Sequence, residues 1–145
     1  MLQRNILIPV VFGVAATLLL FLGLTAAARP KQYKVVIQYS ARDSLSAVGL
    51  NRNLKNLTEG WPEARLAVVF HGPGLDLLVA SKTRYAQEMA SYKAKGVELI
   101  ACENTMATRK IARDEILPVA SFVKMGIKEI VYRQADGWYY IKGGL

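Results

Sequence analysis

The sequence contains one cysteine and one histidine, and each stands at the end of a run of apolar residues. Cys102 ends the run VELIAC, and His71 directly follows the run RLAVVF. Cysteine is nucleophilic as the thiolate, which is favoured by the unpaired N–H groups and partial positive charge of a helix N-terminus. Asn104 or Thr105 can cap a helix that opens just after Cys102. The pattern therefore indicates a reactive thiol, with a small buried residue at a strand end as the alternative.

The turn that His71 opens, His71-Gly72-Pro73-Gly74, is the second candidate element. His71 can act as a base for Cys102, contact a ligand or cap the turn, while Gly72 and Gly74 permit a sharp reversal or a close backbone approach. The turn lacks the Lys-Ser/Thr of a phosphate-binding loop. One histidine and one cysteine do not complete the four ligands of a structural zinc site, so we expect neither a metal nor a cofactor. The candidate site comprises Cys102 as the catalytic residue and His71, Gly72, Gly74, Asn104 and Thr105 as pocket residues.

Apolar runs alternate with amphipathic segments along the chain. This alternation predicts βαβ units and a single three-layer α/β sandwich with a mostly parallel five-stranded sheet. The expected strands span residues 34–39, 65–70, 97–102, 118–123 and 138–142, and the expected helices span about 44–60, 81–95, 105–113 and 124–135. An alternative makes residues 129–132 and 138–141 a β-hairpin.

The carboxyl ends of the strands are the expected position of the site, because ligands bind there in parallel sheets. A flavodoxin-like winding places the first strand between the second and the third. His71 and Cys102 then begin roughly 10 Å apart. They line one pocket with the loop 40–44 as its third wall, without forming a tight ion pair.

The sequence predicts that an N-terminal hydrophobic helix, within residues 1–28, precedes this domain. Residues 6–24 carry no charge, Arg4 precedes them, and Ala26 and Ala28 supply the small residues of a cleavage site. This pattern predicts a signal peptide, and its length, close to the about 20 residues that span a bilayer, keeps an uncleaved membrane anchor open. Either reading places the domain, residues 33–145, outside the cytosol: exported, periplasmic or membrane-anchored through 6–24.

The chain has a net charge of +8, but its basic residues are scattered singly. This distribution does not form the basic patch with interleaved aromatic residues that is typical of nucleic-acid binding, so we expect no nucleic-acid partner. A lone cysteine makes no disulfide within the chain. We expect a homo-oligomer, because burial of apolar residues between subunits stabilises a small core.

Three segments of the sequence are similar to the DsrE/DsrF-like (YchN-like) family. They are VVFHGPG at 68–74, GVE at 96–98 leading into CENTM at 102–106, and RQADGWYYIK at 133–142. The resemblance implies a five-stranded, mostly parallel α/β fold that assembles into trimers or hexamers. It also implies Cys102 as the position that carries sulfur as a persulfide in some members.

Two functions follow from these observations. In the first, the protein handles sulfane sulfur through a persulfide on Cys102, as a sulfurtransferase or sulfur carrier with a sulfur donor or acceptor protein as partner. In the second, it is a non-catalytic oligomeric module that binds a ligand or a partner. A hydrolase is less supported, because no oriented Cys-His-Asn/Asp set is recognisable.

Overall fold

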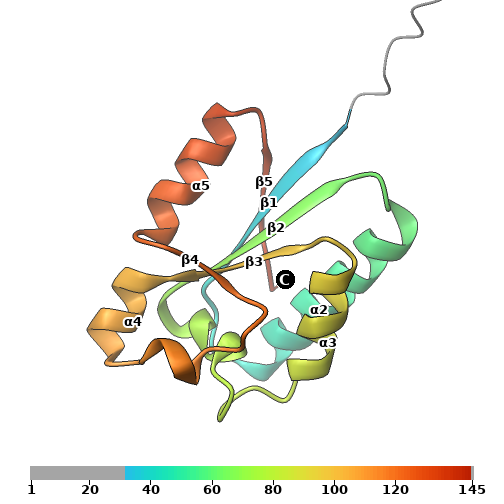
Figure 1. Ribbon diagram of the computed structural model, residues 1–145. Coiled ribbons are helices and arrows are strands. Elements are labelled where there is room, and N and C mark those ends of the chain that lie inside the picture. The colour runs from blue at the N-terminus through green and yellow to red at the C-terminus, as the bar shows by residue number, and fades with distance from the viewer. Residues whose placement is uncertain (1–31, 145) are drawn as a thin grey trace, which may run out of the picture. The chain divides into compact units, whose positions relative to one another are not determined.

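The computed structural model describes residues 32–144, which form an α/β unit around a five-stranded sheet (Figure 1). The strands are β1 (Lys34–Tyr39), β2 (Arg65–Phe70), β3 (Glu98–Cys102), β4 (Ser121–Val123) and β5 (Tyr139–Lys142). The helices are α2 (Ser44–Gly60), α3 (Ala86–Ala94), α4 (Glu103–Arg109) and α5 (Gly126–Ala135), with 3-10 helices η1 (Gly72–Leu78) and η2 (Arg113–Glu115). The predicted α/β class with five strands is confirmed. The predicted signal peptide or anchor lies outside the described residues. Among residues 32–144, no helix has the length and apolar character needed to cross a bilayer.

The strand order is β4-β3-β2-β1-β5, and all four pairings are parallel. The hairpin alternative is wrong, because residues 129–132 lie in α5 and β5 pairs in parallel with β1. The predicted position of β1 between β2 and β3 is also wrong, since β2 pairs directly with β3. The chain steps in one direction from β1 to β4. It then returns through α5 to place β5 on the other side of β1.

The two faces of the sheet carry cores of unequal size. On one face, α2 and α3 bury Leu50, Leu54, Met89 and Tyr92 against residues such as Val68, Phe70 and Leu99. On the other face, Ile130 of α5 packs on a smaller cluster that contains Val36, Ala67, Val69, Ile100 and Trp138. Figure 1 shows α2 and α3 on one side of the sheet and α5 on the other. Both faces of the central strands are therefore buried, which explains their nearly continuous apolar sequences.

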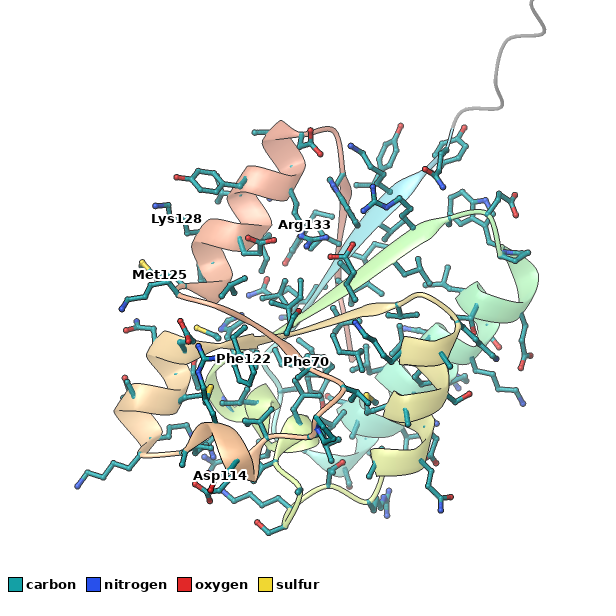
Figure 2. All side chains as sticks on the ribbon, in the orientation of Figure 1. Phe70, Asp114, Phe122, Met125, Lys128 and Arg133 are labelled. Atoms are coloured by element: carbon teal, nitrogen blue, oxygen red, sulfur yellow. The ribbon has the colours of Figure 1, made fainter. Side chains whose placement is uncertain are left out.

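Arg133 helps to hold α5 on the sheet and lies between the helix and the strands (Figure 2). Its guanidinium donates to Glu98 of β3 and to Glu129 of its own helix, each at 2.7 Å. It also lies over the ring of Trp138, 4.4 Å from the ring centroid. These contacts fix the C-terminal half of α5, and the packing described below fixes its N-terminus.

Helices α3 and α4 differ from their predicted bounds, the first because of contacts distant in sequence and the second because of a local turn. The helix predicted over 81–95 begins at Ala86, since the segment before it is held by a bridge from Val79 to Ile116 and a bond from Ala80 N to Glu115 O. The helix predicted to reach about residue 113 ends at Arg109. Lys110 follows it in the left-handed conformation, with φ of 54°.

Candidate functional site

His71 and Cys102 leave neighbouring strands side by side. Phe70 and Ala101 are paired in the β2–β3 register, so His71 and Cys102 come one residue later on each strand. Both also approach Gly126: a Cβ built on this glycine would lie 3.2 Å from the Cys102 Cβ and 3.4 Å from the His71 Cβ. The predicted separation of about 10 Å is wrong because directly paired strands lie about 4.8 Å apart.

The Cys102 sulfur is buried and accepts a hydrogen bond from the backbone of another helix. The Sγ atom accepts a hydrogen bond from the Gly126 N–H at 3.2 Å, and the side chain is only 5% exposed. Burial works to raise the pKa of the Cys102 thiol. The polar groups of Thr105 and the hydrogen bond from the Gly126 N–H outweigh burial and hold the pKa below its ordinary value. The site therefore favours the thiolate.

Two helices, α4 and α5, begin beside Cys102. Helix α4 starts at Glu103, directly after β3, and α5 starts at Gly126, shortly after β4. The Asn104 N–H donates to the Lys124 carbonyl at 3.1 Å and ties the two starts together. The Glu103 carboxylate is paired with Arg113. The cysteine thus lies where the connections of two adjacent strands diverge, the position at which parallel α/β sheets bind ligands.

Gly72 is held onto α4 by two side chains spaced one turn apart. Its N–H donates to Thr105 Oγ1 at 3.0 Å, and its carbonyl accepts from Arg109 Nη1 at the same distance. Arg109 also bonds Asp76 of η1 at 2.6 Å. Gly72 has φ of 52°, a left-handed conformation that glycine adopts without strain. The start of η1 is therefore fixed beside Thr105 and Cys102.

His71 is engaged with β1 and β5. Its Nε2 lies 2.8 Å from the Gln38 amide nitrogen, and the Gln38 Oε1 accepts a hydrogen bond from the Tyr140 hydroxyl. Burial lowers the pKa of His71, so the imidazole is neutral at pH 7. Because neutral His71 supplies no positive charge, the preference for the thiolate rests on the hydrogen-bond donors around the sulfur.

The structure places four of the predicted pocket residues on elements that adjoin Cys102 and the fifth elsewhere. His71 follows the neighbouring strand, Asn104 and Thr105 lie in the first turn of α4, and Gly72 is bonded to Thr105. Gly74 instead packs against the end of β1, where an added Cβ would lie 2.6 Å from the Tyr39 carbonyl oxygen. Gly126 was not among the predicted residues, although a glycine between a strand and an amphipathic helix is a recognisable sign of close backbone approach.

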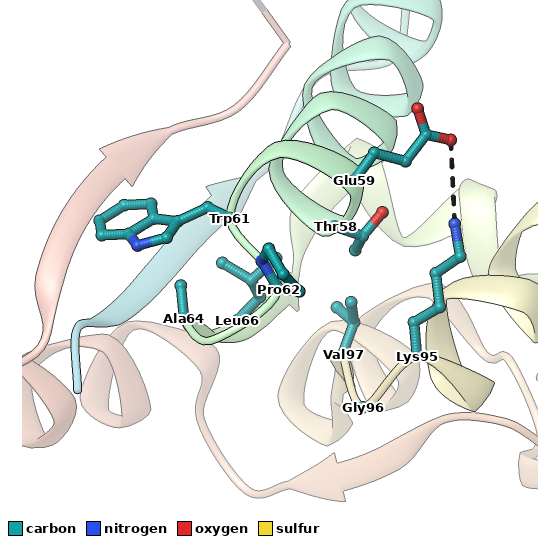
Figure 3. Close-up of a pocket in the computed structure, with 9 residues that line it drawn as sticks. All are labelled: Thr58, Glu59, Trp61, Pro62, Ala64, Leu66, Lys95, Gly96 and Val97. Atoms are coloured by element: carbon teal, nitrogen blue, oxygen red, sulfur yellow. Dashed lines mark ion pairs between the residues drawn. The ribbon is translucent and has the colours of Figure 1, made fainter. Parts of the chain in front are cut away.

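Other features of the described chain lie apart from the thiol. A cavity of about 400 Å³ opens at the amino ends of the strands, between the end of α2 and the start of β3 (Figure 3). Leu66, Val97 and Trp61 contribute apolar lining, and Glu59 and Lys95 approach to 4.0 Å at its rim. Within residues 32–144, no three His, Cys, Asp or Glu side chains are grouped to hold a metal ion.

The fold and the site define a class: α/β proteins that carry a thiol at the carboxyl edge of a parallel sheet. The chain belongs to the DsrE/DsrF-like family, whose model matches residues 31–142. This membership supports a role related to sulfur metabolism. A comparison with curated proteins finds no match.

Two solved structures of proteins of unknown function are similar to this chain. MTH1491 from Methanobacterium thermoautotrophicum superposes with a TM-score of 0.73 at 29% identity, covering 77% of this chain and 99% of that one. BT1422 from Bacteroides thetaiotaomicron superposes with a TM-score of 0.61 at 19% identity, covering 75% of this chain and 93% of that one. The second likeness supports the fold alone.

Proposed function

We propose that the protein carries sulfane sulfur as a persulfide on Cys102. The observation that supports this most directly is the hydrogen bond from the Gly126 N–H to Sγ, beside a lowered pKa of the chain's one cysteine. Family membership is consistent with sulfur chemistry. Proteins that transfer sulfane sulfur need a thiol that is both a good nucleophile and a good leaving group, and a lowered thiol pKa serves the second need.

The transfer requires two displacement steps. In loading, the Cys102 thiolate attacks the sulfane sulfur of a donor. A bond forms between Sγ and that sulfur, the bond from the sulfur to the donor breaks, and the leaving group keeps the electron pair. In unloading, an acceptor thiolate attacks the outer sulfur and the electron pair returns to Sγ. Neither step changes the net redox state, so no external oxidant or cofactor is needed.

Intact mass spectrometry tests the proposal. After incubation with inorganic polysulfide and removal of the excess, the protein is expected to gain the mass of one sulfur atom. Dithiothreitol should remove it, and Cys102→Ser should not acquire it. Absence of the gain in folded protein whose thiol is alkylated after unfolding would contradict the proposal. A gain of equal size in Cys102→Ser would also contradict it.

A second candidate, an oligomeric binding module, is favoured by the outer side of α5. Ile127 and Val131 lie one turn apart and are 53% and 55% exposed, and Met125 and Tyr132 extend the same apolar surface. Exposed apolar side chains in such a row are typical of an interface. This surface supports homo-oligomer assembly whether or not Cys102 carries sulfur.

The paired substitution Ile127→Glu and Val131→Glu is expected to convert an oligomer into a monomer, because it places charges in an apolar contact. Light scattering at micromolar concentration measures the mass. The matched control, Gln87→Glu with Ser91→Glu, places two charges at the same spacing on exposed positions of α3 and should leave the mass unchanged. An unaltered mass in the first variant, or a monomeric wild type, would contradict this assignment.

A further inference from the structure

The face of the sheet that α5 covers carries polar side chains at its carboxyl end. The apolar cluster beneath α5 includes three strand residues, Val36, Val69 and Ile100. Side chains two residues apart on a strand point to the same face. The residues two positions later on the same three strands are Gln38, His71 and Cys102. His71 keeps an extended backbone, with φ of −146° and ψ of 171°, so the alternation continues through it. Tyr140 of β5 is paired with Val36 and shares this face.

A chain of hydrogen bonds joins three of these side chains. The Tyr140 hydroxyl donates to Gln38 Oε1, and Gln38 Nε2 lies 2.8 Å from His71 Nε2. An amide nitrogen is only a donor, so a contact of this length requires a lone pair on the ring nitrogen. His71 Nε2 is therefore the acceptor and carries no proton.

The other ring nitrogen of His71 must then carry the proton. A neutral imidazole has one N–H, and the hydrogen bond made at one nitrogen decides which nitrogen bears it. Among the described residues, Nδ1 has no hydrogen-bond partner. It is also not one of the fully buried atoms that lack a partner, which are Tyr39 Oη and Arg133 Nη1. The Nδ1–H is therefore open to solvent or to a ligand.

We propose that Gln38 is a positioning residue that fixes His71 as the Nδ1–H tautomer, so that His71 is a hydrogen-bond donor to an acceptor bound at Cys102 and not a base for the thiol. The two side chains start side by side, because both Cβ atoms lie within 3.4 Å of the Cβ position of Gly126. The identity of the acceptor rests on the proposed function. It is the negatively charged outer sulfur of the persulfide.

A histidine fixed in this way acts differently from a base. A base for Cys102 would take up the thiol proton through a free lone pair and become an imidazolium cation. The basic lone pair of His71 is instead occupied by the Gln38 amide. The ring stays neutral in the empty and the loaded protein. Its N–H meets the outer sulfur only after loading, so it stabilises the persulfide without activating the thiol.

Nitrogen NMR measures the tautomer, and the chain's single histidine makes the assignment unambiguous. In the full-length protein labelled with ¹⁵N at histidine, spectra at pH 7 should show Nδ1 protonated and Nε2 unprotonated. Gln38→Glu replaces the amide donor with an acceptor and should place a proton on Nε2. If this variant does not fold, Gln38→Met, which has no donor, is measured in its place and should also place the proton on Nε2. A wild type protonated at Nε2, or a folded variant with the wild-type pattern, would overturn the proposal.

Gln134→Glu is the matched control. Gln134 lies on α5, the helix that covers this face, and its amide donates to the Ile130 carbonyl at 3.3 Å. The substitution therefore makes the same chemical change without removing the donor to His71. Its spectrum should match that of the wild type. A proton on Nε2 in this variant would assign the tautomer to the packing of α5 and overturn the role of Gln38.

Loading with inorganic polysulfide tests the donor role. Mass spectrometry gives the loaded fraction, and the Nδ1 resonance should shift in proportion to it while Nδ1 keeps its proton. Loading with an unmoved Nδ1 resonance would overturn the donor role and leave sulfur carriage intact. Absence of loading would contradict sulfur carriage, whereas the tautomer, measured in protein that has met no sulfur donor, would still stand.

Discussion

Replacing Gly74 by alanine is expected to lower the free energy of unfolding by about 3 kcal/mol, at the upper end of overpacking effects. The added Cβ would lie 2.6 Å from the Tyr39 carbonyl oxygen and 2.8 Å from the Ser40 Cα. These are backbone atoms at the end of a central strand, so the clash is relieved only by moving η1 away from β1. Urea unfolding followed by far-ultraviolet circular dichroism measures the change.

Gly60→Ala is the control for this substitution. Gly60 is the last residue of α2, and a Cβ added there meets no atom within 4 Å. Alanine has the higher helix propensity, so this variant should be as stable as the wild type or slightly more stable. Equal stability of the Gly74→Ala and Gly60→Ala variants would show that η1 does not depend on close approach to β1.

Gly126→Ala is expected to raise the pKa of the Cys102 thiol and to slow its alkylation at neutral pH about five-fold, the effect of losing roughly 1 kcal/mol of hydrogen bonding. The new Cβ would lie 3.1 Å from Val69 Cγ1 and 3.2 Å from Cys102 Cβ. The start of α5 must therefore withdraw by a few tenths of an ångström, which weakens the bond from the Gly126 N–H to Sγ. The pH profile of iodoacetamide alkylation measures the outcome.

Ile127→Ala serves as its control. Ile127 is the next residue of α5 and is more than half exposed, so its truncation changes the helix start without adding an atom near the sulfur. Its alkylation profile should follow that of the wild type. A Gly126→Ala profile that does the same would show that the N–H of α5 contributes nothing to the thiol.

The fold class could be predicted because each central strand has a local signature. The apolar runs of β1, β2 and β3 reflect burial on both faces, and this property is visible in the sequence alone. The strand order is not local. It depends on where each connecting segment packs against the sheet. The sequences of β2 and β3 are the same type of apolar run whether these strands are adjacent or separated by β1.

The residues of the candidate site that follow strand ends could be predicted from the sequence. The residues that reach the site through packing of a distant helix could not. The positions of Cys102 and His71 follow from the ends of β3 and β2. The part played by Gly126 requires that a helix 24 residues further along approach the thiol. The interaction of His71 with Gln38 had a visible sign, a single amide within the otherwise apolar run of β1.

The position of β1 in the sheet has a consequence for how the chain is made. One side of β1 pairs with β2, but the other pairs with β5, and Gln38 and Tyr140, which are hydrogen-bonded across these strands, are 102 positions apart. During synthesis this second edge has no partner until almost all of the domain has left the ribosome. An unpaired central edge is a template for pairing with other chains, and contacts so distant in sequence form slowly. A nascent chain that has formed β1 to β4 is therefore an aggregation-prone intermediate. The exposed edge of β1 is covered only when β5, Tyr139–Lys142, pairs with it.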